Sequence, residues 1–126
     1  MSISMEGCMM IDWGQVKSLR NDVGHDEFDE IVELFLEEVE SIVEKLRESP
    51  NISELENDMH SLKGSALNLG FKAFSQMCLS GEKMAAAGKA DLVDLTAIVA
   101  CFDLSKAKFM TNVSTELQAQ FRQETG

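Results

Sequence analysis

The sequence predicts an all-α protein, an antiparallel up-down-up-down four-helix bundle with an additional short N-terminal helix. The chain has a single proline and few aromatic residues, and good helix formers fill its long segments. Apolar residues recur at alternating steps of three and four, which is the spacing of a helix with one buried face. The links between these periodic segments are short, so consecutive helices should be antiparallel neighbours.

The length of 126 residues is sufficient for one domain with a single core. Residues 1–10 show no hydrophobic period and are predicted to be a flexible lead-in. Residues 11–122 are predicted to form the helical bundle, and residues 123–126 to be a frayed tail. No internal repeat or low-complexity tract divides this domain.

The first two helices have recognisable starts. Asp12 is suited to cap a short helix that carries Trp13, which we expect to be a core residue. His25 is expected in the following loop, with Asp26 and Asp29 as a capping pair for the second helix. That second helix has the clearest period, and its outward face is rich in glutamate. Its predicted buried stripe consists of Phe28, Ile31, Val32, Phe35, Val39, Ile42, Val43 and Leu46.

The last three helices have predicted boundaries as well. The lone proline ends the second helix, and Ser53 with Glu56 forms a predicted capping box for the third. Gly70 is expected to close the third helix in the left-handed conformation. The fourth helix should span residues 71–87, and Asp91 should cap the last one. The predicted inner residues of the last helix are Leu95, Ile98, Val99, Phe102, Phe109, Val113, Leu117 and Phe121.

Charge and composition exclude several classes of partner. A formal net charge of −11 disfavours nucleic acid or an anionic membrane surface, because no basic stripe is present to neutralise phosphates. The cysteines Cys8, Cys78 and Cys101 have no CxxC spacing, so we expect reduced thiols rather than a metal or disulfide site. No apolar run reaches the roughly 18 residues of a membrane span, and no secretion signal is expected. The expected compartment is the cytoplasm.

The most informative stretch is residues 59–70, within the third helix. His60 lies about 130° from the centre of the apolar stripe and should therefore face water. Lys63, Gly64 and Leu67 share this outer face. Lys63 could provide a cation for a phosphoryl group on the imidazole, Gly64 would leave the ring uncrowded, and Leu67 offers an apolar contact for a partner. The stripe itself consists of Ile52, Leu55, Met59, Leu62, Ala66 and Leu69.

These residues resemble the signature of histidine phosphotransfer (HPt) domains of bacterial and eukaryotic phosphorelays. The resemblance is carried by the run His60-Ser61-Leu62-Lys63-Gly64-Ser65-Ala66, followed by Asn68-Leu69-Gly70. It is more specific than a lone histidine, because a histidine, a lysine and two glycines must all fall in register. Weaker helical patterning that fits the family extends from about residue 11 to residue 113. The alternative is an ordinary surface histidine on an amphipathic helix.

The resemblance implies roles for individual residues. In HPt domains an exposed histidine takes a phosphoryl group from a receiver aspartate or a sensor kinase and passes it to another receiver. By this resemblance His60 is the phosphoacceptor, Lys63 neutralises the phosphoryl charge and Gly64 gives steric clearance. The residues implied in partner binding are Ser61, Leu67 and Asn68.

The implied protein is a phosphocarrier rather than an enzyme with its own ATP site. No Gly-rich nucleotide loop of the Walker type is present. We expect no cofactor on this chain, and Mg²⁺ on the partner receiver. The expected partners are response-regulator receiver domains and a sensor histidine kinase, and the chain is expected to be a monomer.

Two positions depart from the family pattern. Glu82 stands where the family often has a glutamine that hydrogen-bonds the ring or its phosphoryl group. A carboxylate there would hold the N–H of the ring and would repel the phosphorylated state somewhat. Gly81 stands where the family usually has a large apolar residue, and either weakens the fourth helix or lets two helices approach closely.

Two other classes of function compete with a phosphocarrier. A helical adaptor or inhibitor would keep the bundle and bind a kinase or receiver without carrying phosphate. A di-iron bundle would need Glu-x-x-His pairs from separate helices, whereas this chain has two histidines in all. A solvated acidic face explains the glutamates of the second helix better.

Overall fold

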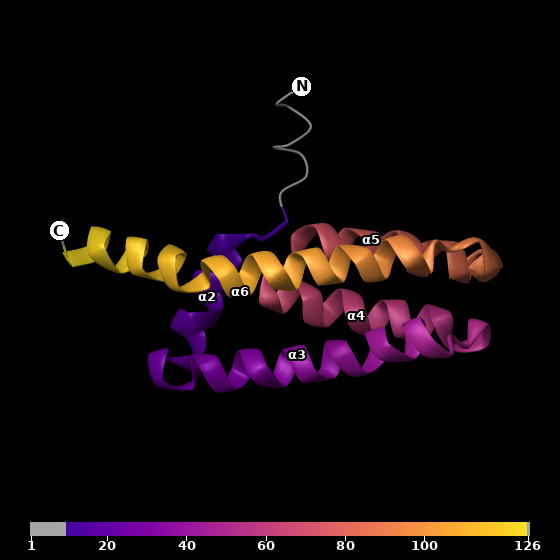
Figure 1. Ribbon diagram of the computed structural model, residues 1–126, viewed down its shortest axis with the longest axis horizontal. Helices are drawn as coiled ribbons and strands as arrows, with labels where there is room; N and C mark the ends of the chain where they lie inside the picture. Colours follow the sequence, from indigo (N-terminus) through magenta and orange to yellow (C-terminus); the bar gives the residue numbers. More distant parts are fainter. Residues whose placement is uncertain (1–9, 126) are drawn as a thin grey trace, which may run out of the picture.

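A computed structural model describes the backbone of residues 10–125 and the side chains as far as residue 117. In this part of the chain, α-helices and short 3-10 turns follow one another, and consecutive helices from the second to the last run antiparallel (Figure 1). The predicted all-α bundle with an additional short N-terminal helix is confirmed. The elements are α2 (Trp13–Val23), α3 (His25–Glu48), η1 (Ile52–Glu54), α4 (Leu55–Leu69), α5 (Lys72–Ala86), η2 (Ala90–Leu92) and α6 (Leu95–Thr125).

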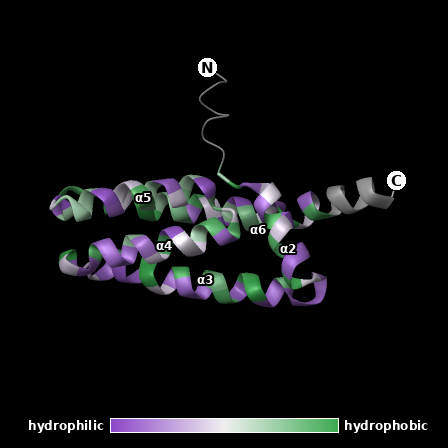
Figure 2. Ribbon diagram, turned by 180° about the vertical axis from the view of Figure 1, so that it is seen from behind, coloured by the Kyte–Doolittle hydropathy of each residue, from purple (hydrophilic) through white to green (hydrophobic). Residues whose placement is uncertain are grey.

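Each helix of the bundle is amphipathic, with hydrophobic and hydrophilic residues alternating along it (Figure 2). The core is formed by the apolar faces of α3, α4, α5 and α6, together with Ile11 and Val16. Aromatic rings close the core at the end that α2 crosses. There the ring of Trp13 stacks on that of Phe109 with a centroid distance of 5.8 Å. Trp13 therefore packs against the core, as predicted.

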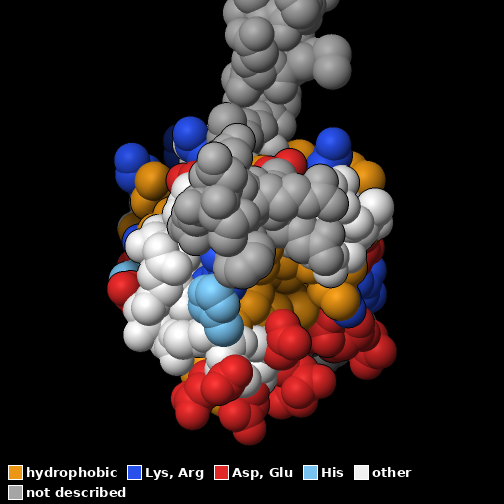
Figure 3. Space-filling model, turned by 90° about the vertical axis from the view of Figure 1, so that its left-hand side faces the viewer, with side chains coloured by type: hydrophobic (Ala, Val, Ile, Leu, Met, Phe, Trp, Pro, Cys, Tyr) orange, Lys and Arg blue, Asp and Glu red, His pale blue; other side chains and the backbone are white. Residues whose placement is uncertain are grey.

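The second predicted helix is α3, and it ends before Ser49. Its predicted stripe is buried or half-buried, and Leu36 belongs to it as well. Figure 3 views the molecule from the end at which α3 begins. In this view acidic side chains gather at the bottom, where α3 lies. The glutamates of this face point into solvent, as predicted: Glu30, Glu33, Glu37, Glu38 and Glu44 are exposed.

The helix α4 lies between α3 and α5 and also contacts α2. Its residues Leu55, Met59, Leu62 and Ala66 are completely buried. Gly70 follows α4 with φ of 79° and ψ of 15°, the predicted left-handed conformation. Because the inner face of α4 is packed tightly in the core, the helix cannot turn about its axis, and the residues of its outer face keep pointing away from the core.

The N-terminal strap, residues 10–12, is hydrogen-bonded to the turn between α4 and α5. The amide of Asp12 donates to the carbonyl of Gly70 at 2.7 Å, and the amide of Lys72 donates to the carbonyl of Met10 at 2.9 Å. Met10, which the sequence assigns to the predicted lead-in, takes part in these hydrogen bonds. Residues 1–9 of the predicted lead-in lie outside the described part of the chain.

Three predictions of helix starts were wrong. His25 begins α3 rather than lying in a loop, although it is exposed, and no side chain caps this helix. The predicted capping box of Ser53 and Glu56 is absent, because η1 precedes α4 and its cap is Asn51, which accepts hydrogen bonds from the amide and hydroxyl of Ser53.

The other errors concern η1 and η2. Ile52 belongs to η1 and is 48% exposed, so it is not part of the buried stripe. Asp91 lies in η2, and the side chain that caps α6 is Asp94, which accepts from the amide of Ala97 at 3.0 Å. In each case a short 3-10 turn shifts the start of the next helix by a few residues.

The last helix, α6, is continuous over Leu95–Thr125. It passes through Ser105, which is completely buried, and extends beyond the end of the bundle (Figure 1). The helical trace thus enters the predicted tail at residues 123–126, while the predicted core position Phe121 lies outside the described side chains. No described helix is both long and apolar enough to span a bilayer.

Two of the cysteines lie in the described part of the chain, and both are free thiols. Cys78 is completely buried, and this burial raises its pKa to about 12. Cys101 is half-buried, and burial raises its pKa as well. Both are consistent with the predicted reduced thiols, and Cys8 lies outside the described residues.

Candidate functional site

His60 is presented to solvent from the middle of α4. Its neighbours along the chain, Met59 and Leu62, are completely buried, and the 3.6-residue period therefore turns His60 outward. Its side chain is 67% exposed. The predicted orientation of the ring is confirmed.

One edge of the imidazole is held by Glu82 of α5. The Nδ1 atom of His60 lies 2.9 Å from Oε2 of Glu82. Because an ionised carboxylate can only accept a hydrogen bond, Nδ1 carries the proton and donates it. In the neutral ring this leaves the lone pair on Nε2, the nitrogen that does not face Glu82.

Lys63 shares the same carboxylate. Its Nζ donates to Oε1 of Glu82 at 2.8 Å, and its side chain is 23% exposed. The helix α4 thus contributes the ring and the ammonium, and α5 contributes the carboxylate between them. Sequence analysis placed His60 and Lys63 on one face, which is confirmed, but it did not predict that Lys63 would be paired with Glu82.

The charge of Glu82 is stabilised by these contacts. The hydrogen bond from Lys63 and then that from His60 lower the pKa of Glu82, while partial desolvation opposes them. The carboxyl is therefore ionised at neutral pH, and its charge balances that of Lys63.

The two unusual glycines have opposite environments. Apart from its chain neighbours and the backbone of its own helix, a Cβ atom on Gly64 would meet nothing within 4 Å. A Cβ atom on Gly81 would lie 2.9 Å from Sδ of Met59, so α4 and α5 approach closely at this point. Of the two alternatives for Gly81, the structure shows the close approach, in a helix that is continuous there.

The three residues predicted to bind a partner are on the exposed side of α4. Leu67 is 53% exposed and so offers apolar area to a partner. Ser61 and Asn68 are exposed as well. The structure thus brings these residues and His60 onto one face.

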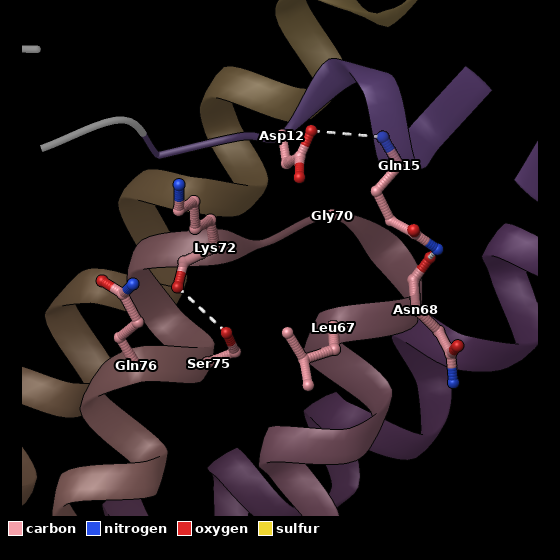
Figure 4. Close-up of a pocket in the computed structure, with 8 residues that line it drawn as sticks. All are labelled: Asp12, Gln15, Leu67, Asn68, Gly70, Lys72, Ser75 and Gln76. Carbon is pink, nitrogen blue, oxygen red and sulfur yellow. Dashed lines mark hydrogen bonds between the residues drawn. The ribbon is translucent and has the colours of Figure 1, made fainter. Parts of the chain in front are cut away.

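A pocket of about 340 Å³ opens beside Leu67, at the end of the face that carries His60 (Figure 4). Leu67 points into this pocket, and Ser75 faces it from the first turn of α5. Sequence analysis missed most of these residues, because they come from three helices and share no motif. The pocket is lined by Asp12, Gln15, Leu67, Asn68, Gly70, Lys72, Ser75 and Gln76.

A hydrogen bond between α2 and the end of α4 lies at the pocket: Nε2 of Gln15 donates to the carbonyl of Asn68 at 3.4 Å. At the start of α2, the side chain of Asp12 accepts from the amide of Gln15 at 3.2 Å. The position of α2 therefore shapes the surface two turns away from His60.

The described residues contain no group of three or more His, Cys, Asp or Glu side chains arranged to hold a metal ion. This includes the acidic face of α3, where the glutamates point outward separately. The combination that remains on the His60 face is one nucleophilic nitrogen, one paired ammonium and an open approach over a glycine.

Comparisons with known proteins identify a family for this chain. Residues 30–123 match the Hpt domain family. Among solved structures, one described as a histidine-containing phosphotransfer protein from rice is similar at a TM-score of 0.68 and 25% identity, covering 93% of this chain and 89% of that one. A histidine-containing phosphotransfer protein from maize has the same fold, with a TM-score of 0.62 and 21% identity over 90% of this chain and 86% of that one. A search of curated protein sequences finds no match.

Proposed function

Because this chain belongs to the Hpt family of histidine phosphotransfer domains, we propose that it is a phosphorelay intermediate. His60 accepts a phosphoryl group from a receiver aspartate or a sensor kinase and passes it to the aspartate of a response-regulator receiver domain. The observation that carries this proposal is the solvent-facing ring, whose Nδ1 is hydrogen-bonded to Glu82 so that Nε2 is left for the phosphoryl group.

The chemistry of acceptance follows from this tautomer. The lone pair on Nε2 attacks the phosphorus of an aspartyl phosphate, and the bond between phosphorus and the aspartyl oxygen breaks. The carboxylate leaves with the electron pair, and the ring becomes an imidazolium that carries the phosphoryl group on Nε2 and the proton on Nδ1. Glu82, which accepts that proton's hydrogen bond, stabilises the positive charge.

Lys63 and Gly64 support the same step. Lys63 lies beside the ring and can exchange its contact with Glu82 for a contact with a phosphoryl oxygen, which neutralises part of the phosphoryl charge. Gly64 leaves open the space through which a receiver brings its aspartate in line with Nε2.

We propose that the partner supplies the remaining catalytic groups. Phosphoryl transfer depends mainly on positioning and on cations, so a carrier needs little machinery of its own. In this proposal the receiver holds the Mg²⁺, and this chain has no ATP site and acts as a monomer in the cytoplasm. The docking surface consists of Ser61, Leu67 and Asn68 together with the adjoining pocket.

The proposal is tested by phosphoryl transfer from phosphorylated receiver domains. Receiver domains of the source organism are phosphorylated with acetyl phosphate and mixed with this protein. We expect an acid-labile, base-stable label on the wild-type protein that is lost in His60→Gln. The matched control is His25→Gln, which removes the other histidine, also exposed, and should keep the label.

Two results would contradict the proposal. One is a label that survives in His60→Gln. The other is the absence of transfer from every receiver of the organism, which would favour the adaptor or inhibitor. In that case a receiver or kinase should still bind the unlabelled protein.

A further inference from the structure

The corner between α2 and α3, residues 17–27, lies at one end of the bundle (Figure 1). Val16 is 1% exposed and Phe28 is 4% exposed, so a buried apolar side chain stands on either side of the corner. Within the corner the one buried residue is Arg20, which is 8% exposed. A charged side chain therefore takes the place of an apolar anchor. The apolar residues of the corner, both half-buried, are Leu19 and Val23.

The guanidinium of Arg20 has no partner among the described residues. Its Nε atom is buried and makes no hydrogen bond within this part of the chain. No described carboxylate forms an ion pair with it, whereas Arg47 is paired with Glu44 and Asp103. Arg20 lies in the last turn of α2, where the helix dipole favours a cation, but the dipole gives Nε no acceptor.

Burial without an acceptor makes this attachment weak. A guanidinium keeps its charge in proteins, and a buried donor that finds no acceptor has lost its hydrogen bonds to water without replacement. When the corner opens, water restores these hydrogen bonds to Arg20. Opening therefore costs less free energy than it would with an apolar side chain at this position.

The first turn of α2 is attached more firmly than the corner. The amide of Asp12 donates to the carbonyl of Gly70 at 2.7 Å, and the ring of Trp13 stacks on that of Phe109. Val16 is buried in the core. These contacts hold residues 12–16 in place when the corner opens.

Gly24 provides a joint for this motion, because it is the one residue between α2 and α3. Its φ of 92° and ψ of 150° form a conformation that glycine adopts without steric cost. Apart from its two chain neighbours, a Cβ atom on Gly24 would meet nothing within 4 Å. The dihedral angles of Gly24 can therefore change without displacing packed side chains.

We propose that residues 17–27 open as a local unit with Gly24 as the hinge, and that this opening competes with the docking of a receiver. The competition with docking rests on the proposed function. Gln15 of α2 lines the pocket beside Leu67, so a receiver that fills this pocket contacts α2. Opening leaves α2 with a single turn, which is unstable by itself. The receiver therefore binds the closed form better and holds the corner shut.

Hydrogen exchange of single amides, followed by NMR, tests the opening without a receiver. The reporter is the amide of Gly24, which donates to the carbonyl of Arg20 at 2.8 Å. The reference amides are those of Met59 and Leu62, which are completely buried in α4 and should exchange through global unfolding. We expect the amide of Gly24 to exchange at least about tenfold faster than the reference amides, and that of Asp12 more slowly than that of Gly24.

Arg20→Met should fasten the corner, because it replaces the guanidinium with an unbranched apolar side chain. Exchange at Gly24 should slow by about tenfold or more relative to the reference amides of α4. The ratio is the decisive quantity, since a gain in global stability alone slows all these amides equally. The matched control is Lys17→Met, which removes a half-buried cation from the same corner and should leave the ratio unchanged. Circular dichroism of each variant tests whether the fold is retained.

The inference is overturned if the ratio is the same in the wild type and Arg20→Met, or if Lys17→Met changes it as much. It is also overturned if Gly24 of the wild type exchanges as slowly as the reference amides. That comparison needs no variant, so it decides the question even where Arg20→Met does not fold.

A second measurement tests the competition with docking. A receiver that accepts phosphoryl groups from the wild type should slow exchange at Gly24 when it binds, and Arg20→Met should bind it more tightly. A receiver that binds without slowing this exchange would overturn the competition. If no receiver accepts a phosphoryl group from this protein, that result counts against the proposed function alone, because the exchange rates of the free protein decide the opening.

Discussion

Gly81 and Met59 meet across the interface of α4 and α5 with no room for a side chain on residue 81. A Cβ atom placed on Gly81 would lie 2.9 Å from Sδ and 3.3 Å from Cγ of Met59, which is itself completely buried. The close approach occurs directly beside His60 and Glu82, which are the next residues on the two helices. The missing side chain at Gly81 therefore helps to set the distance between the ring and its carboxylate.

Replacing Gly81 with leucine should destabilise the fold. The larger side chain would have to displace Met59 from a filled core, which typically costs about 1–3 kcal/mol in the free energy of unfolding. Urea unfolding of Gly81→Leu measures this cost. An unchanged unfolding midpoint would show that the interface of α4 and α5 can open without loss.

Gly64→Ala should raise the stability of the fold but slow phosphoryl transfer from receivers. Alanine is preferred over glycine inside a helix, and its methyl group would meet nothing beyond its chain neighbours and the backbone of its own helix, so the free energy of unfolding should rise by about 0.5–1 kcal/mol. The same methyl group stands beside His60 in the path of a docking receiver, and transfer from receivers should slow by about tenfold or more. Labelling by phosphoramidate, a small phosphoryl donor that does not dock, is the control and should be unaffected.

Lys63→Gln should shift the equilibrium of transfer away from this protein. One partly exposed ion pair contributes about 1 kcal/mol or less, which corresponds to a change of up to about fivefold. The ratio of phosphorylated His60 to phosphorylated receiver at equilibrium measures this change. Lys83→Gln is the matched control, because Lys83 is an exposed lysine next to Glu82 in the chain and should leave the ratio unaltered.

Leu67→Asp should weaken receiver docking without affecting the ring. An aspartate would place a negative charge where the exposed leucine offers apolar area. We therefore expect KM for a phosphorylated receiver to rise by about tenfold or more. Leu104→Asp is the matched control, since Leu104 is 63% exposed on α6. Equal effects of the two substitutions would argue against a docking surface at Leu67.

The thiol of Cys78 should be inert in the folded protein. Its pKa of about 12 keeps it protonated at pH values near 8, and it is completely buried. In a variant that lacks Cys8, a thiol reagent should therefore modify Cys101 in the native state and Cys78 only after unfolding. Rapid native modification of Cys78 would show that α5 opens locally.

The helices and the outward direction of His60 were predictable because both follow from the period of apolar residues. A stripe such as that of α3 specifies which side of a helix is buried, and the opposite side is then exposed. The left-handed Gly70 was predictable for the same kind of local reason, since glycine adopts that conformation without steric cost.

The helix starts and the contacts of the site were harder to predict. At Ser53 and Asp91 a 3-10 turn competes with the cap that the local sequence suggests, and the energies of the two differ little. The pairing of Lys63 with Glu82 and the contribution of Gln15 to the pocket depend on the packing of separate helices. No spacing within one helix encodes them.

The exposure of a single imidazole on one face also limits how the proposed relay can branch. A receiver that covers His60 and Leu67 excludes every other receiver and any kinase for as long as it is bound, because all of them need the same nitrogen. In the proposed relay, partners would therefore compete for this protein, and the flow of phosphate among several outputs would follow their relative concentrations and affinities.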